Sequence, residues 1–338
     1  MQRRDFLIAP FAASVASLYA PAAHTQSSLA PLKLTLDFRV TSQTSPFFLA
    51  LEKGYYKDEG LAVTIDVGSG SVASITRVAS GAYDLGLGDI GSLIEFHATN
   101  PDTPVQAIYQ YYNRAPFVII GRKDRGITQD FLSLKGKKVA AAAVEATRRC
   151  WPMAARALGA PPDLFEWVTT DFSARDNVMV RGDVDAATYF HDSAVSLFAR
   201  MPEQTLSVLE FSQTGLQLYG NALLGGKLLQ EKPDAARAFV RATHRALRET
   251  LAQPDAALAA VKAREPIINA DTERARWVIT RRYLLTPEVR AHGLGGVQPA
   301  VLARQIDEVA EAFALPRKPA PERIFNPAFL PADRQVSA

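Results

Sequence analysis

The fold class is decided by SPFFLALEKGYYKDEGLAVTIDVGSGSVASITRVASGAYDLGLG, residues 45–88 of this 338-residue chain. The stretch begins with a helical segment, 47–56, and continues with an alternating apolar strand, 61–67. A glycine-rich turn then opens an amphipathic helix, 72–79, and a short strand follows at 83–88. Helices that alternate with strands in this way predict an α/β layered fold with a mostly parallel sheet.

The same alternation continues through the middle of the chain, and the last third becomes helical. Strands are predicted at 33–38, 104–112, 117–121, 137–144, 164–170, 184–190, 205–211 and 215–225, and helices at 146–159, 173–182, 191–201, 233–253, 254–265, 271–285 and 299–315. The Pro-rich tail from Pro316 is expected to be irregular. Segments 77–91 and 178–192 each contain a helix end, Gly-x-x-Asp, a strand and a helix-opening loop. This repeat would fit two lobes built on similar units, and chance similarity between α/β units is the alternative.

The first residues predict an export signal. Arg3 and Arg4 precede a modest apolar run, and Ala20-Pro21-Ala22 ends it with a small-residue cleavage pattern, which predicts a signal peptide at 1–22. The sequence RRDFL resembles the twin-arginine export motif, and the general secretion route is the alternative. Because the apolar run is too short and too rich in Ala and Ser to span a membrane, we expect a periplasmic protein.

Composition argues against several classes of partner and chemistry. A formal net charge of +3 gives no reason to expect nucleic acid. Cys150 is the single cysteine, so it forms no internal disulfide, and its helical setting predicts a buried thiol. The histidines are isolated: His24, His97, His191, His244 and His292. Metal-ligand spacings and a Gly-x-Ser-x-Gly nucleophile turn do not occur in the sequence, so we expect no cofactor and no catalysis.

The turn from Gly68 to Ser71 could be a phosphate loop, and its residues argue against that. A P-loop needs a lysine after the second glycine, which this turn lacks, and Ala73 at the third glycine position of a dinucleotide loop is a permitted but weak match. What remains is a strand-to-helix turn in which Ser69 or Ser71 caps the helix and free N–H groups attract a polar or anionic ligand. Similar loops occur at 41–45, 88–92, 144–148 and 189–192. Such loops gather at the carboxyl ends of strands, where open α/β sheets bind ligands.

Residues 34–93 resemble the nitrate/taurine/thiamine-precursor family of periplasmic substrate-binding proteins of ABC importers, through ALEKGYYKDEGL and SGAYDLGLG. The resemblance implies an α/β, two-lobed periplasmic binding protein type II fold, each lobe a mixed sheet flanked by helices, that closes on its ligand. Lobe one would be 32–112 plus 219–338 and lobe two 113–218, with hinge crossings near 112–115 and 218–221. Many pyrimidine-precursor binders of the family have Leu-Asp-Trp where this chain has Leu36-Asp37-Phe38, which leaves the ligand open.

The resemblance places the ligand in the cleft between the lobes. The residues predicted to line it are Phe38, Thr41, Ser42, Gln43, Ser69, Ser71, Asp89, Tyr109, Tyr111, Arg114, Glu145, Arg148, Tyr189, His191 and Tyr219. Tyr109 and Tyr111 could instead pack in the core, Arg148 could be a surface charge, and His191 could be structural. Aromatic side chains favour a ring, and an arginine with loop N–H groups favours a polar or acidic substituent.

The expected function is delivery of this small molecule to an ABC permease in the inner membrane, by a monomer. A pyrimidine thiamine precursor, an aromatic carboxylate and a sulfonate all fit the predicted cleft. One alternative is an enzyme, since fungal relatives of the fold resemble pyrimidine-precursor synthases that consume their own histidine and use a cofactor-bearing lysine. Another is a sensor partner that presents its closed form to a membrane receptor.

Overall fold

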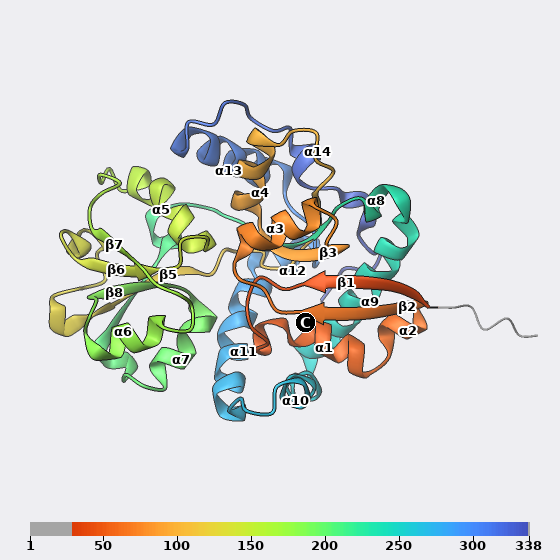
Figure 1. Cartoon of the computed structure of the whole chain (residues 1–338), viewed down its shortest axis with the longest axis horizontal. Coiled ribbons are helices and arrows are strands. Elements are labelled where there is room, and N and C mark those ends of the chain that lie inside the picture. Colours follow the sequence, from red (N-terminus) through yellow and green to blue (C-terminus); the bar gives the residue numbers. More distant parts are fainter. Residues whose placement is uncertain (1–28, 337–338) are drawn as a thin grey trace, which may run out of the picture.

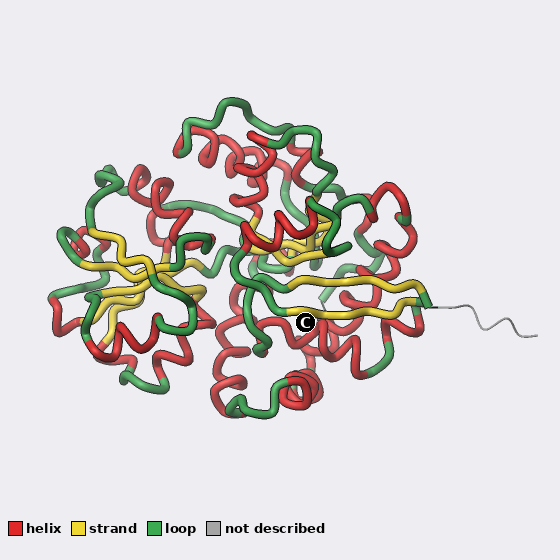
Figure 2. Tube along the Cα trace, viewed as in Figure 1, coloured by secondary structure: helices red, strands yellow, loops and turns green. Residues whose placement is uncertain are grey.

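The fold consists of two five-stranded sheets with helices packed on their faces (Figure 1; Figure 2). The computed structural model describes residues 29–336, so the predicted signal peptide lies outside the described residues. The first sheet has the order β2 (Leu61–Asp66), β1 (Ala30–Thr35), β3 (Leu85–Asp89), β10 (Asn221–Gly225), β4 (Gln106–Gln110). The second has the order β7 (Glu166–Thr169), β6 (Lys138–Ala141), β8 (Ala186–Phe190), β5 (Phe117–Arg122), β9 (Leu206–Glu210).

Both sheets are mixed in the same way. In each, three strands are parallel neighbours, and one strand, β10 or β5, runs antiparallel to the strands on both of its sides. The two sheets with their helices are the lobes of a periplasmic binding protein fold, called here the first and the second lobe. The predicted fold class is therefore confirmed.

The helices are distributed unequally between the lobes (Figure 1). The first lobe has α1 (Ser45–Glu52), α2 (Tyr55–Asp58), α3 (Ser71–Ala79), α4 (Ile90–Thr99), α8 (Leu228–Glu231), α9 (Pro233–Ala252), α10 (Asp255–Arg264), α11 (Ala270–Leu284), α12 (Pro287–His292), α13 (Pro299–Ala312) and α14 (Pro321–Ile324). The second lobe has α5 (Ala146–Ala157), α6 (Arg175–Arg181) and α7 (Val195–Phe198). Short 3-10 turns are η1 (Ser42–Thr44), η2 (Lys123–Arg125), η3 (Phe131–Leu134), η4 (His191–Ala194), η5 (Glu203–Thr205), η6 (Phe211–Thr214) and η7 (Pro327–Phe329). Within residues 29–336, none of the helices combines the length and apolar character needed to cross a membrane.

The chain passes between the lobes twice, after β4 and after β9. The two passages lie side by side, because the Ala115 N–H donates to the Leu218 carbonyl at 2.8 Å and the Gly220 N–H donates to the Tyr112 carbonyl at 3.0 Å. We propose that these paired passages form the hinge, since such connections can absorb the backbone rotation of domain closure. The lobe boundaries expected from the sequence fall inside them.

The lobes are in contact on the cleft side. Ile94 and Val105 of the first lobe belong to the same buried apolar cluster as Phe117 and Trp151 of the second lobe. An ion pair between Arg149 on α5 and Glu95 on α4 also crosses from lobe to lobe. The two lobes are therefore in contact, and this arrangement is called here the closed form.

Local structure departs from the sequence prediction at a few places. Residues 215–220 form no strand, and 191–201 begin as the 3-10 turn η4 before the short helix α7. Helix α12 was not predicted, although Thr286 caps it by accepting the Val289 N–H at 3.2 Å and Pro287 occupies its first turn. The stretch 45–88 folds into α1, α2, β2, α3 and β3, and the single helix predicted at 47–56 is divided at Gly54, which has φ 74°.

Candidate functional site

A cavity lies between the lobes at the carboxyl ends of β1 and β2. About 40 Å³ of it can hold the centre of a water-sized molecule in this arrangement of the lobes, and both lobes line it. The lining residues are Asp37, Phe38, Gln43, Thr44, Gly70, Ser71, Leu87, Tyr111, Tyr112, Glu145, Ala146, Thr147, Phe172, Arg175, Phe190, Ser193 and Asn221. A cleft that is lined by rings and a few polar groups from two lobes is typical of a small-molecule site.

Aromatic side chains form much of the cavity wall. Phe38 of the first lobe and Phe172 of the second contact each other edge-to-face, with ring centroids 5.1 Å apart. Tyr111 is fixed because its hydroxyl donates to the Gln43 carbonyl at 2.6 Å, and Tyr112 contacts Phe190. Rings held rigidly around a cavity favour a planar ligand that stacks against them.

Asp37 supplies a carboxylate at the end of β1. The Asn221 amide, at the start of β10, donates to Asp37 Oδ2 at 2.6 Å. Burial raises the pKa of Asp37 to about 6, while the Asn221 hydrogen bond opposes that rise. Asp37 Oδ1 has no hydrogen-bond partner from another described side chain, so it can accept from a ligand.

Glu145 and Arg175 form a buried ion pair on the second lobe. Arg175 Nη1 lies 3.0 Å from Glu145 Oε2, and each side chain is about 5% exposed. The guanidinium stacks on the Tyr189 ring at 3.9 Å. Burial raises the pKa of Glu145, and the neighbouring Arg175 charge opposes this. Arg175 Nε is buried and has no hydrogen-bond partner among the described residues, so one donor of a cavity-lining guanidinium is unused.

The glycine turn before α3 brings the first lobe close to the second. The N–H groups of Gly68 and Gly70 donate to the carbonyls of Phe38 and Asp37, at 3.0 and 2.7 Å, so this turn fixes the loop that presents both side chains. A Cβ on Gly68 would lie 1.8 Å from the Leu36 carbonyl oxygen, which only glycine avoids. The prediction that a serine caps α3 is wrong, because Gly70 occupies the cap position at φ 112°. The first-turn N–H groups of α3 are thus left beside the cavity for an acceptor.

A family profile described as NMT1/THI5 like matches residues 41–257, more than half of the chain. The chain belongs to the NMT1/THI5-like family. This agrees with the resemblance found in residues 34–93.

This NMT1/THI5-like chain is similar in sequence to an enzyme and similar in fold to binding proteins. The 4-amino-5-hydroxymethyl-2-methylpyrimidine phosphate synthase of Aspergillus parasiticus is 26% identical over 250 residues, covering 70% of this chain and 72% of the synthase. The aliphatic sulphonate binding protein SsuA of Escherichia coli superposes with a TM-score of 0.69 at 15% identity, covering 89% of this chain and 99% of SsuA. The nitrate-binding protein NrtA of Synechocystis PCC 6803 has a TM-score of 0.65 at 14% identity, with coverage of 89% and 87%. At these identities the two structures establish the fold.

Five of the predicted site residues of this NMT1/THI5-like chain line the cavity: Phe38, Gln43, Ser71, Tyr111 and Glu145. Thr41 and Ser42 lie buried behind it, where Thr41 donates to Gln43 Oε1 and Ser42 bonds to Glu273. Ser69 and Arg114 are exposed.

The other predicted residues make contacts outside the cavity lining. Asp89 caps α4 and lines a smaller neighbouring cavity. The Tyr109 hydroxyl lies 2.9 Å from His244 Nδ1, and the Tyr219 hydroxyl donates to Glu288 at 2.7 Å. Tyr189 donates to Asp176 at 2.8 Å, and His191 Nδ1 lies 2.8 Å from the Tyr283 hydroxyl. Arg148 donates to Thr169 at 3.0 Å.

Other residues that line the cavity were not predicted from the sequence, among them Asp37, Tyr112, Phe172, Arg175 and Asn221. Asp37 and Tyr112 are direct neighbours of predicted residues, so extending those loops by one position would have found them. Arg175 lies in the segment 173–182, which was interpreted only as a helix. Asn221 begins β10, which follows the whole second lobe in sequence, and no local signal connects it to Asp37.

Proposed function

We propose that the protein is a periplasmic solute-binding protein that delivers a small organic ligand to the permease of an ABC importer. The observation that supports this best is the cavity between two lobes of a periplasmic binding protein fold, lined by rings and a few polar groups. The paired hinge passages supply the means of opening and closing around a ligand. The predicted signal peptide supports a periplasmic location.

The polar groups favour a ring that offers both donors and acceptors. Asp37 needs a donor, whereas Arg175 and the first turn of α3 need an acceptor. An aminopyrimidine such as the thiamine precursor satisfies both needs and stacks on the aromatic walls. An aromatic carboxylate would satisfy only Arg175 and α3, and an aliphatic sulfonate would leave the rings without a partner. We therefore propose a pyrimidine thiamine precursor as the ligand.

A thermal-shift screen tests this proposal with one compound of each class: 4-amino-5-hydroxymethyl-2-methylpyrimidine, benzoate and ethanesulfonate. A ligand at 100 times its Kd stabilises the folded protein by about 2.7 kcal/mol, which raises Tm by several degrees. We expect such a shift for the pyrimidine alone. A shift with benzoate or ethanesulfonate alone would mean that the ligand is an aromatic carboxylate or a sulfonate and not a pyrimidine. The absence of a shift with all three compounds would contradict the binding function.

The names of the fungal relatives support a second candidate, a pyrimidine-precursor synthase. The described lining of the cavity includes no lysine to hold a pyridoxal cofactor and no histidine to be consumed. Purified protein mixed with pyridoxal phosphate would decide between the two functions. A Schiff-base absorbance and formation of the phosphorylated pyrimidine would favour the enzyme, and an unchanged spectrum would favour the binding protein.

The permease partner needs a cellular test. A deletion strain should lose uptake of the ligand while any response of a membrane receptor to that ligand stays intact. Loss of the response with intact uptake would favour the sensor alternative.

A further inference from the structure

Asp192 is a fully buried carboxylate of the second lobe whose hydrogen-bond partners come from outside that lobe's sheet and helices. It lies in η4, beside the cavity residue Ser193. The Gln43 amide donates to Asp192 Oδ1, and the Tyr112 hydroxyl donates to Oδ2. The Thr280 hydroxyl on α11 also donates to Oδ2, at 2.8 Å.

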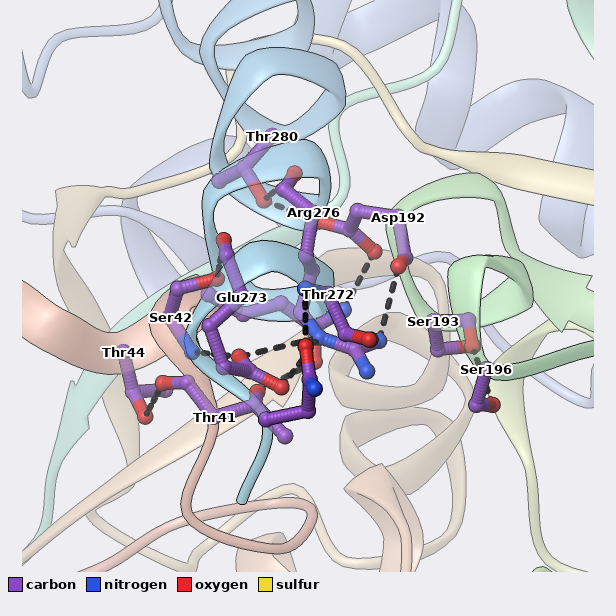
Figure 3. A network of polar contacts seen from close by, with 12 residues as sticks. Thr41, Ser42, Thr44, Asp192, Ser193, Ser196, Thr272, Glu273, Arg276 and Thr280 are labelled. Atoms are coloured by element: carbon purple, nitrogen blue, oxygen red, sulfur yellow. Dashed lines mark hydrogen bonds and ion pairs between the residues drawn. The ribbon is translucent and has the colours of Figure 1, made fainter. Parts of the chain in front are cut away.

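The backbone of η4 is held by α11 as well. Arg276 Nη1 donates to the Asp192 carbonyl oxygen at 2.8 Å, and Arg276 Nε lies 3.1 Å from Glu273 Oε2. Glu273 in turn accepts the Ser42 N–H at 2.6 Å. Figure 3 shows Arg276, Asp192 and Thr280 converging where α11 faces η4. We call Asp192, Gln43, Tyr112, Arg276 and Thr280 the Asp192 cluster.

The donors of the Asp192 cluster come from the first lobe or from the passage that leaves it. Gln43 follows β1, Arg276 and Thr280 are on α11, and Tyr112 lies in the first passage between the lobes. The described residues of the second lobe beyond this passage contribute no side-chain hydrogen bond to Asp192. Separation of the lobes would leave these buried groups to find water instead, so the cluster favours the closed form.

Two members of the cluster also line the cavity, Gln43 and Tyr112. The Gln43 amide is fixed at both ends, because Nε2 donates to Asp192 and Oε1 accepts the Thr41 hydroxyl at 3.0 Å. Asp192 therefore determines how two cavity side chains are presented, although it does not line the cavity itself. This makes it a positioning residue.

We propose that Asp192 favours the closed arrangement of the lobes and positions Gln43 and Tyr112 for ligand binding. The positioning part rests on the proposed binding function, whereas the closure part needs no ligand. The apparent affinity for a ligand is reduced by the fraction of the protein that is in the binding-competent form. A contact that favours the closed form therefore raises the apparent affinity.

Small-angle scattering of the ligand-free protein tests the closure part. The wild type should have a compact radius of gyration near ~20 Å, and Asp192→Asn should increase it. Thr280→Val, which removes one donor from the opposite lobe, should cause a smaller increase. The matched control is Glu311→Gln, because the Arg156–Glu311 ion pair also joins the lobes but is about half exposed. A folded D192N protein as compact as the wild type would overturn the proposal, and T280V provides the same test if D192N fails to fold.

Calorimetry with the ligand found in the screen tests the positioning part. We expect D192N to weaken binding by at least about tenfold, the equivalent of one 1.4 kcal/mol hydrogen bond. The D192N/T280V double variant should lose less than the two single variants combined, since both changes break the same bond. Additive losses, or wild-type affinity in D192N, would contradict the positioning role. If no compound in the screen binds, the scattering result still decides the closure part.

Discussion

Replacement of Gly70 by alanine should oppose closure of the cleft. Gly70 has φ 112°, and a Cβ there would lie 2.9 Å from the carbonyl oxygen of Val144 and 3.2 Å from its Cγ2. Val144 follows β6 in the second lobe, so these overlaps exist only when the lobes are together. The added methyl group therefore affects the closed form through a contact that the open form does not make.

The expected magnitude has two parts. The backbone conformation costs alanine about 1–3 kcal/mol in either form, and this lowers the stability of the fold. The overlap with Val144 adds about 1–3 kcal/mol in the closed form alone, as for an overpacked core. That second part lowers ligand affinity by roughly 5-fold to 150-fold.

Gly81→Ala is the matched control. Gly81 has φ 77°, and a Cβ there would meet no atom within 4 Å. It should lose about 1–2 kcal/mol of stability through backbone strain and keep the affinity of the wild type. Urea unfolding measures the stability, calorimetry the affinity, and scattering the ligand-free shape. Equal affinities of G70A and G81A would refute the reasoning that Gly70 enables closure.

Three further changes test single residues. Burial raises the pKa of Asp89 to about 7, so the stability from its protonated form is present below about pH 4 and lost as pH rises through 7. Asp89→Asn keeps a cap for α4 without the charge, and its free energy of unfolding in urea should exceed that of the wild type by about 4 kcal/mol at pH 8 but not at pH 4. Tyr109→Phe should lose about 1 kcal/mol of stability with the His244 hydrogen bond and keep ligand affinity; weakened binding in calorimetry would place Tyr109 in the site. Phe172→Ala should weaken binding at least about tenfold, since it removes one aromatic wall, and unchanged binding would argue against a stacked ring.

Local patterns predicted the elements of the fold well where one face of a strand or helix is buried. The alternation in 61–67 and the helical spacing in 72–79 both became elements at those positions, because the side chains that point inward are the apolar ones. The same reasoning failed at 215–220, whose apolar residues pack beside the hinge without pairing in the sheet. The apolar side chains of 215–220 are buried by tertiary contacts, and such contacts produce no periodic pattern in the sequence.

The candidate site was predicted only where a loop follows a strand of the first lobe or opens α5. Tyr109 and Tyr111 are two residues apart and would share one face of a continuous strand. The strand ends at Gln110, so Tyr111 reaches the cavity while Tyr109 stays in the core beside His244. Phe172 and Arg175 enter the site only because the second lobe closes over the first, and no spacing in a sequence reports that movement.

The position of β10 in the first sheet has a consequence for biosynthesis. This strand lies between β3 and β4, yet it is made only after the whole second lobe has been translated. Until residue 225 is available, β3 and β4 each expose an unpaired edge that can join another chain. The nascent protein therefore cannot complete its first sheet early, and a fragment ending before Asn221 should aggregate instead of folding as a half-protein.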